Sequence, residues 1–212
     1  MMKRWTLFLL LVAGMTTSNA RSMKDFLVST PSVVQNILSH ENWLDCVDFI
    51  ASGMKASVKN NFGDVSTLTA LSDNYARIEI SPVSSMEFKM LPIKKDTIIC
   101  VVRTYILPNA SESELHVYRS DWRRLISKYF VQTPSVKQFV KKGTSKENLQ
   151  HVTDVLHPTF ITAYHSEETD EMRFEINVGA SNEEQMRELE PFLYDGLVYK
   201  WNGRRFTFDH AE

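Results

Sequence analysis

Hydrophobic and polar residues alternate along much of the chain. In YARIEIS, residues 75–81, and in MEFKM, residues 86–90, every second side chain is apolar, and the second pattern assigns Glu87 and Lys89 to a solvent face. Alternation with a period of two is typical of β-strands that bury one face. The run IICVVRTY, residues 98–105, begins with consecutive apolar residues and predicts a central strand that is covered on both faces.

The chain returns in ELHVYRS, residues 114–120, so this region predicts an antiparallel meander of roughly three to five strands. Further on, FITAYHS, residues 160–166, and MRFEINV, residues 172–178, bracket a polar tip and predict a hairpin. A terminal hairpin is predicted where LVYKW and RRFTF flank Asn202 and Gly203, because Asn-Gly favours the tight turn between two strands.

Helical spacing is clearest in residues 40–58, where apolar side chains recur three or four positions apart and Asn42 is a candidate N-cap. A second N-terminal helix is expected within residues 22–39, starting near Thr30 with Pro31 in its first turn. Two shorter helices are predicted, at residues 145–156 and 182–192. The predicted fold class is therefore α+β: an antiparallel sheet, formed by a meander and C-terminal hairpins, with an N-terminal helix pair.

Residues 1–20 are typical of a cleaved secretory signal peptide. Lys3 and Arg4 precede a short apolar run, and small residues end the segment at Ala20. The run is too short for a transmembrane anchor, which needs about 20 apolar residues. No cysteine lies near the expected cleavage site, so the sequence predicts a periplasmic or extracellular protein that is not a lipoprotein.

Residues 21–212 would form the mature chain, which is long enough for a single secreted α+β domain with a substantial core. Because residues 1–20 hold Lys3 and Arg4 but no carboxylate side chain, their removal changes the formal net charge from −2 to −4. Nucleic acids and anionic membranes need a concentrated basic face, so the sequence predicts neither as a partner. The mature chain also contains no predicted membrane span.

The sequence contains two cysteines and does not decide whether they form a disulfide. Cys46 falls in the helical pattern and Cys100 in the central apolar run. An oxidising compartment allows a disulfide between them, but both flanking sequences are typical of core, where free thiols behave as small hydrophobic groups. A disulfide and two buried free thiols are both compatible with the sequence.

The stretch VYRSDWRRL, residues 117–125, is echoed by VYKWNGRRF, residues 198–206. A repeat would extend at the same offset, yet the preceding strand then aligns with a turn, and the tryptophans fall out of register. A degenerate duplication stays open, but the echo indicates no shared site. We expect Trp122 and Trp201 to pack against the sheet. At least two of the nearby arginines should face solvent, from among Arg123, Arg124, Arg204 and Arg205.

Candidate chemistry begins with SGMK, which contains Ser52 and Lys55, and with SDN, which starts at Ser72. Serine β-lactamases and penicillin-binding proteins use SxxK, SDN and KTG elements, in which the lysine helps to take the serine proton. Here Ser52 lies near the end of a predicted helix instead of its start, and the third element is KGT. A small periplasmic serine hydrolase is therefore an alternative, while a helix end beside a turn is the favoured interpretation.

Three histidines, His151, His157 and His165, precede an acidic cluster and raise the question of a metal site. They lack HExxH spacing, and Pro158 restricts His157 to extended geometry. The acidic cluster is typical of a solvated hairpin tip. The sequence therefore predicts no metal and no other cofactor, with these histidines as the alternative metal ligands.

Arginine and aromatic side chains gather near the end of the predicted meander. They could form an anion or glycan site, or an aromatic platform for a peptide, although solvated arginines and buried rings are the commoner arrangement. The candidate binding residues are Arg103, Tyr105, Tyr118, Arg119, Trp122 and Arg123.

The order of these motifs resembles a family of secreted Bacteroidales proteins that carries a domain of unknown function. The resemblance rests on WLDCVDFIASGMKASVKNNFG, IICVVRTYILPNASESELHVYRSDW and LHPTFITAYHSEETDEMRFEI, and it covers nearly the whole mature chain. It implies a bacterial periplasmic or surface-associated protein and carries over no activity, cofactor or site residue.

The sequence favours a non-catalytic binding or envelope-interaction module over an enzyme. It shows a signal peptide and an ample core, and it lacks GxSxG, P-loop, GxGxxG and CxxC motifs. The partner is an envelope protein, a peptide or a glycan, and the oligomeric state stays open.

Overall fold

The computed structural model describes residues 21–108, 110–177 and 183–212, so the predicted signal peptide lies outside the described residues. The helices are α1 (Met23–Val28), α2 (His40–Ala51), α3 (Val136–Phe139), α4 (Lys146–Val155) and α5 (Glu183–Leu189), with the 3-10 helices η1 (Ser127–Tyr129) and η2 (Glu190–Phe192). The strands are β1 (Ala56–Lys59), β2 (Val65–Leu71), β3 (Tyr75–Ser81), β4 (Ser84–Ile93), β5 (Asp96–Leu107), β6 (Ala110–Arg119), β7 (Arg124–Leu125), β8 (Phe160–His165), β9 (Glu171–Asn177), β10 (Leu197–Trp201) and β11 (Phe206–Ala211). Within these ranges, no helix has the length and apolar character that a membrane crossing requires.

The first seven strands form one antiparallel sheet, in which their spatial order is their order in the sequence. The strand β5 lies inside this large sheet, between β4 and β6, and its residues Ile98 to Val102 are all buried, at 0% to 3% exposure. Consecutive apolar residues suit such a strand because both of its faces are covered. The predicted central strand is confirmed, and the meander is longer than expected because short strands at both edges join it.

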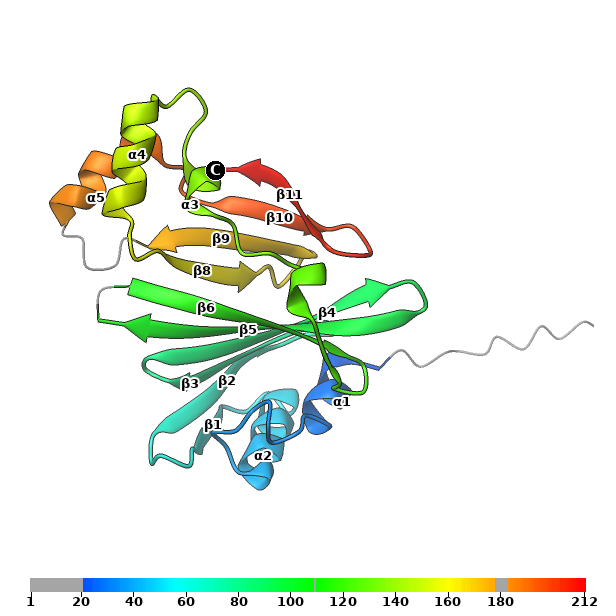
Figure 1. Ribbon diagram of the computed structural model, residues 1–212. Coiled ribbons are helices and arrows are strands. Elements are labelled where there is room, and N and C mark those ends of the chain that lie inside the picture. The colour runs from blue at the N-terminus through cyan, green and yellow to red at the C-terminus, as the bar shows by residue number, and fades with distance from the viewer. Residues whose placement is uncertain (1–20, 109, 178–182) are drawn as a thin grey trace, which may run out of the picture.

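The helices α1 and α2 cover one face of the large sheet (Figure 1). Ser22 caps α1 through a capping box with Asp25, and Ser39 caps α2 by accepting the amide of Asn42 at 3.1 Å. The predicted helix pair is confirmed, but its boundaries are corrected: the first helix ends before Thr30, and Asn42 lies inside the second. The serine hydroxyls set these starts because they satisfy first-turn amides that have no partner within the helix.

The strands β8 to β11 form a second, smaller antiparallel sheet in the order β11-β10-β9-β8. Both predicted hairpins are confirmed. At the terminal turn, Gly203 has a φ of 84°, and the side chain of Asn202 accepts the amides of Arg204 and Arg205. Glycine adopts this left-handed conformation without steric cost. In Figure 1 the strand β8 lies beside β6, and β11 forms the edge of the small sheet that is remote from the large one.

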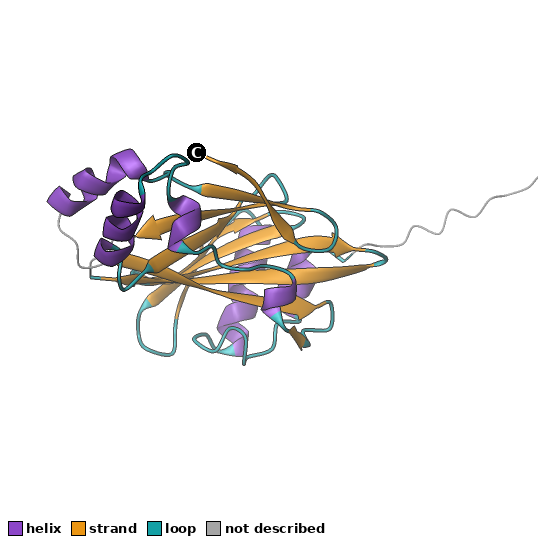
Figure 2. Ribbon diagram, turned by 45° about the horizontal axis from the view of Figure 1, so that its top comes forward, coloured by secondary structure: helices purple, strands orange, loops and turns teal. Residues whose placement is uncertain are grey.

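The large sheet has a hydrophobic core on each face, and Figure 2 shows helices on both sides of the strands. One core lies under α1 and α2 and contains Phe88, and the other lies between the two sheets and contains Trp201.

Cys46 belongs to the first core and Cys100 to the second, so the sheet separates the thiols, and both are free. Burial raises the pKa of Cys46 to about 11 and that of Cys100 to about 12.

The two echoed stretches occupy different environments. Trp122 packs into the core under the helices and donates from Nε1 to the hydroxyl of Ser29 at 3.2 Å. Trp201 packs into the core between the sheets and donates to the carbonyl of Pro92 at 2.8 Å. Both rings are 8% exposed, as predicted, so the likeness marks no equivalent site. The arginines beside them are exposed, also as predicted: Arg123, Arg124, Arg204 and Arg205.

Phe88→Ala should lower the free energy of unfolding by about 3–5 kcal/mol, because it empties a fully buried site. Phe88 is 0% exposed, and its ring centre lies 6.0 Å from that of Trp43 and 6.4 Å from that of Trp122. Urea denaturation followed by circular dichroism measures the change. The matched control is Phe62→Ala, at a ring that is 79% exposed, which should stay within about 0.5 kcal/mol of the wild type. Equal losses in both variants would contradict the core assignment of Phe88.

Candidate functional site

Two regions combine charged side chains with unusual surroundings. The first lies where β8 meets the large sheet and consists of Arg77, Glu87, Lys89 and His165; we call it the polar seam. Glu87 is 4% exposed; its Oε2 accepts the backbone amide of His165 at 2.7 Å, and its Oε1 accepts from Nη1 of Arg77 at 2.9 Å. Burial raises the pKa of Glu87, although the amide and the guanidinium act in the opposite direction. This carboxylate ties the free edge of β8 to the large sheet.

Lys89 is fully buried in the same seam, at 0% exposure. Its Nζ donates to the carbonyl of Glu167 at 3.0 Å and to Oδ1 of Asn74 at 3.3 Å, and it lies 5.9 Å from the centre of the Tyr75 ring. Burial lowers the pKa of Lys89, while Asp170 and Glu167 raise it. A buried ammonium needs such partners, so Lys89 fastens the β8–β9 turn to the β2–β3 turn.

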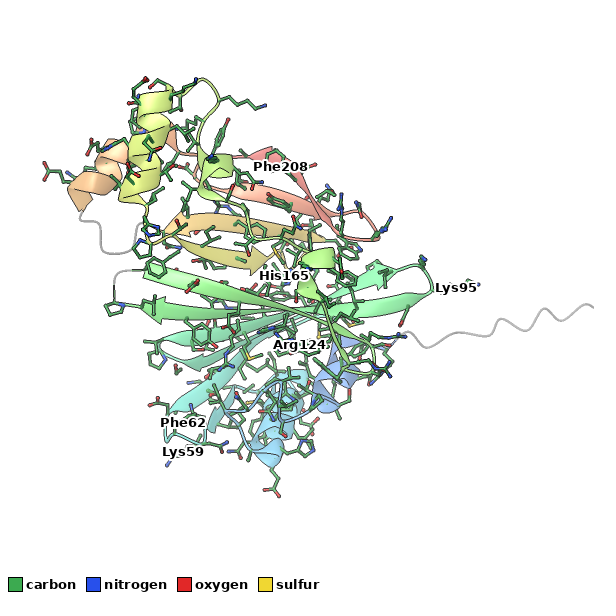
Figure 3. The ribbon with its side chains drawn as sticks, viewed as in Figure 1. Lys59, Phe62, Lys95, Arg124, His165 and Phe208 are labelled. Carbon is green, nitrogen blue, oxygen red and sulfur yellow. The ribbon has the colours of Figure 1, made fainter. Side chains whose placement is uncertain are left out.

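His165 is 7% exposed, and no described side chain hydrogen-bonds either ring nitrogen; the backbone of Cys100 is a polar group that favours the protonated ring. Figure 3 shows it between the two sheets. Burial, with a smaller effect from the ammonium of Lys89, lowers the pKa of His165 to about 3, so the ring is uncharged at neutral pH. An enclosed imidazole does not reach a substrate, so we assign the polar seam to stability and not to catalysis.

The second region is a groove along β11, the remote edge of the small sheet. It consists of two adjoining cavities of about 280 and 490 Å³, which share Gln138 and Phe208 as lining residues. The side chain of Gln138 donates to the hydroxyl of Tyr199 at 2.9 Å, and the Phe208 ring stands edge-on to Tyr199 at 5.7 Å. The floor of the groove is therefore held in place. We call this region the β11 groove and define it by Lys128, Tyr129, Lys137, Lys142, Arg205 and Phe208.

The β11 groove is basic although the whole chain is acidic. Its four cations form no ion pair within the described part of the chain: they are Lys128, Lys137, Lys142 and Arg205. Asp209 is the one carboxylate among the described residues that line the two cavities, and its Oδ2 lies 2.8 Å from Nδ1 of His210. Tyr129 is 64% exposed and Phe208 is 53% exposed. The groove thus combines exposed aromatic surface with cations that have no carboxylate partner; one of them, Lys128, lies 5.7 Å from the centre of the Tyr129 ring.

The residues of the hydrolase alternative do not form a catalytic arrangement. Ser52 is the C-cap residue of α2, Lys55 is exposed in the turn before β1, and Ser72 lies in the turn between β2 and β3. No hydrogen bond among the described residues joins the three side chains, and the hydroxyl of Ser72 has no partner. The C-terminus of a helix carries partial negative charge, which does not favour a serine alkoxide.

The histidines of the metal alternative lie apart. His151 belongs to α4 and contacts Glu188 at 3.0 Å, His157 is exposed beyond the end of α4, and His165 is enclosed in the polar seam. Within residues 21–108, 110–177 and 183–212, no group of three or more His, Cys, Asp or Glu residues is placed to hold a metal ion.

The aromatic candidates at the end of the meander are buried. Tyr118 is 9% exposed and Trp122 is 8% exposed, and both pack into the core under α1 and α2. Their ring centres lie 5.6 Å apart, and Trp122 also meets Phe88 edge-on. The two rings therefore form no exposed platform.

The remaining binding candidates divide between two places. Arg103 lies over the ring of Tyr105 at 5.2 Å, and both side chains are half-buried. Arg119 and Arg123 are exposed, and each forms an ion pair of 3.6 Å with a nearby aspartate. The structure thus keeps Arg103 and Tyr105 together and does not join them to the exposed arginines in one site.

Sequence patterns missed both regions. The assignment of Glu87 and Lys89 to a solvent face is wrong, because the small sheet covers that face of β4. About half of the residues that line the β11 groove come from residues 128–142, where polar and apolar residues follow neither a strand period nor a helix period. The available signal was RRFTF, whose Phe206 and Phe208 share one face of the strand, although only Phe206, at 7% exposure, is covered.

The fold defines a class of α+β protein in which a helix pair covers one face of a seven-stranded sheet and a four-stranded sheet packs on the other. The chain belongs to the family of proteins of unknown function called DUF3256, whose model matches residues 15–206. A solved structure, described as a domain of an uncharacterized protein from Porphyromonas gingivalis W83, is similar at 25% identity and a TM-score of 0.77, covering 88% of this chain and 96% of that chain. No curated protein matches. The predicted resemblance to a Bacteroidales family of unknown function is confirmed.

Acid should destabilise the protein through His165. The pKa of the ring is about 3 in the folded chain but about 6.5 in an unfolded chain. As the pH falls from about 6.5 toward 3, only the unfolded chain binds the proton, so stability that is present above this window is lost within it. Between pH 7.5 and pH 5 this residue should account for a loss of roughly 2 kcal/mol.

His165→Leu should remove this part of the pH dependence, because leucine has a similar volume and leaves no polar atom without a partner. Urea denaturation at the two pH values measures the difference. Comparing the two proteins cancels the contribution of Glu87, whose raised pKa acts in the opposite direction. His157→Leu, at an exposed histidine, is the control and should keep the wild-type behaviour. An unchanged pH dependence in His165→Leu would assign the effect to another group.

Proposed function

We propose that the protein is an exported, non-catalytic binding module that recognises a partner protein of the cell envelope through the β11 groove. The observation that carries the proposal is the combination of exposed Tyr129 and Phe208 with unpaired cations, on a chain whose formal net charge is −2. Exposed apolar surface with a polar rim is typical of interaction sites, and tyrosine and arginine are frequent among residues that dominate binding energy.

The exposure of the aromatic rings favours a macromolecular partner over a small substrate. Small-molecule sites enclose most of their ligand, whereas Tyr129 and Phe208 keep 64% and 53% of their surface exposed. The rings lie on separate segments, η1 and β11, that border the same cavity. A partner that covers both rings must span this cavity.

Two further features support the other parts of the proposal. The signal features of residues 1–20 support export. Ser52 lies at the C-terminal end of α2, and no hydrogen bond among the described residues joins it to Lys55 or Ser72. This supports a non-catalytic role, because acyl transfer needs a nucleophile and a base within hydrogen-bond reach.

Site-specific photocrosslinking tests the proposal. We expect Phe208→p-benzoylphenylalanine to form a saturable adduct with an envelope protein, because the reactive ring stands in the groove. Phe62→p-benzoylphenylalanine is the matched control, since Phe62 is 79% exposed and Figure 3 shows it at the opposite end of the molecule from Phe208. The adducts are measured by mass spectrometry after illumination in an envelope extract from cells that make the protein.

Competition separates specific from incidental adducts. Excess unlabelled protein should suppress the adduct at position 208, and unlabelled Lys137→Glu should suppress it less, because it lacks one groove cation. Unlabelled Lys59→Glu, at an exposed lysine of β1, should compete like the wild type. No adduct at position 208, or equal adducts at positions 208 and 62, would refute the proposed function.

A further inference from the structure

We infer that the partner enters the β11 groove as an extended, acidic segment that pairs with β11 as an additional strand. This inference rests on the proposed function and names both the chemistry and the conformation of the occupant. It follows from the backbone of β11, from the charge of the groove and from the exposed rings.

The backbone of β11 has a free edge beside the groove. On its other edge β11 pairs with β10, with Trp201 opposite Phe206 and Tyr199 opposite Phe208. The amide of Phe206 points away from β10, since it donates to the carbonyl of Phe130 at 2.7 Å. In an antiparallel pair the backbone groups of every second residue point to the same side. The N–H and C=O of Phe208 therefore also point away from β10, toward the free edge of the sheet.

After the bulge in β11, the backbone groups of Ala211 also point away from β10. The amide of Glu212 donates to the carbonyl of Gly196 at 2.9 Å, on the β10 side, so the backbone groups of Ala211 point outward. Among the described residues, neither Phe208 nor Ala211 makes a backbone hydrogen bond outside the pair with β10. The contact at Phe130 closes the start of this edge, and the remainder is open. An open strand edge is a template on which another extended chain adds a strand.

The charges of the groove select an acidic segment. Cations lie at both ends, with Lys128 and Arg205 in one cavity and Lys137 and Lys142 in the other. An added strand directs alternate side chains to opposite faces, so apolar side chains on one face could cover the Phe208 ring while carboxylates meet the cations. A second copy of this chain is a poorer occupant, because pairing two β11 edges would bring like charges together.

The test uses a synthetic peptide of about ten residues in which glutamate alternates with valine and isoleucine, and a set of variants that carry one N-methylated amide each. Because Phe208 and Ala211 are the two residues with open backbone groups, and their β10 partners lie two residues apart, we expect methylation at two positions of the peptide, two residues apart, to weaken binding about fivefold each, the value of one hydrogen bond. Methylation at the position between them should have little effect. A peptide with lysine in place of glutamate should not bind. Fluorescence anisotropy of a labelled peptide measures the affinities.

Variants of the protein tie the binding to the groove. Phe208→Ala and Lys137→Glu should weaken peptide binding at least fivefold, whereas Phe62→Ala and Lys59→Glu, at exposed residues outside the groove, should not. Circular dichroism confirms that each variant is folded.

The outcomes separate this inference from the proposed function. Groove-dependent binding without a two-residue period in the methylation series would overturn strand addition and leave the proposed function in place. Absence of peptide binding, or self-association that Phe208→Ala abolishes, would overturn the acidic segment as the occupant. In each of these cases the crosslinking at position 208 decides the proposed function independently.

Discussion

The buried carboxylate of Glu87 holds the two sheets in their relative position. It accepts the amide of His165 from β8 and the guanidinium of Arg77 from β3, and it is only 4% exposed. Removing either donor would leave a buried carboxylate with fewer hydrogen bonds. Removing the carboxylate would leave the amide of His165 without its acceptor and Arg77 with Glu79 as its remaining partner. The contact therefore fixes β8 relative to β3 and β4, because the carboxylate must lie within hydrogen-bond distance of both donors.

The two edge strands of the small sheet differ in how far their backbone groups are hydrogen-bonded. The edge strand β8 is closed by side chains of the large sheet: besides the bond between Glu87 and His165, the amide of Ala163 donates to the hydroxyl of Ser113 at 3.0 Å. At the other edge, the backbone contact between Phe206 and Phe130 closes only the start of β11. Unpaired strand edges tend to recruit other chains, so proteins usually cover them. The open part of β11 is consistent with a surface kept for a partner.

Charge is distributed to match this asymmetry. Glu87 and Lys89 are buried with hydrogen-bond partners, so their charges act on the junction of the sheets and not on the surface. The four cations of the β11 groove are unpaired within the described residues, on a chain with formal net charge −2. A local basic patch on an acidic protein attracts acidic partners and repels a second copy of the same patch. Position and charge thus favour the same face for binding.

Much of this fold is determined by local sequence. Alternation predicted β3 and β4, a run of consecutive apolar residues predicted β5, and Asn202 with Gly203 predicted the terminal turn. Local sequence carries these signals because strand period and turn chemistry depend on neighbouring residues. The burial of Glu87 and Lys89 depends on tertiary structure alone. The face of β4 that alternation assigns to solvent is covered by residues as distant as His165, which is 78 positions from Glu87. It also decided that Phe206 is buried while Phe208, two residues further on the same face, is 53% exposed. A strand pattern determines which residues share a face, whereas the packing of distant segments determines how far that face is covered.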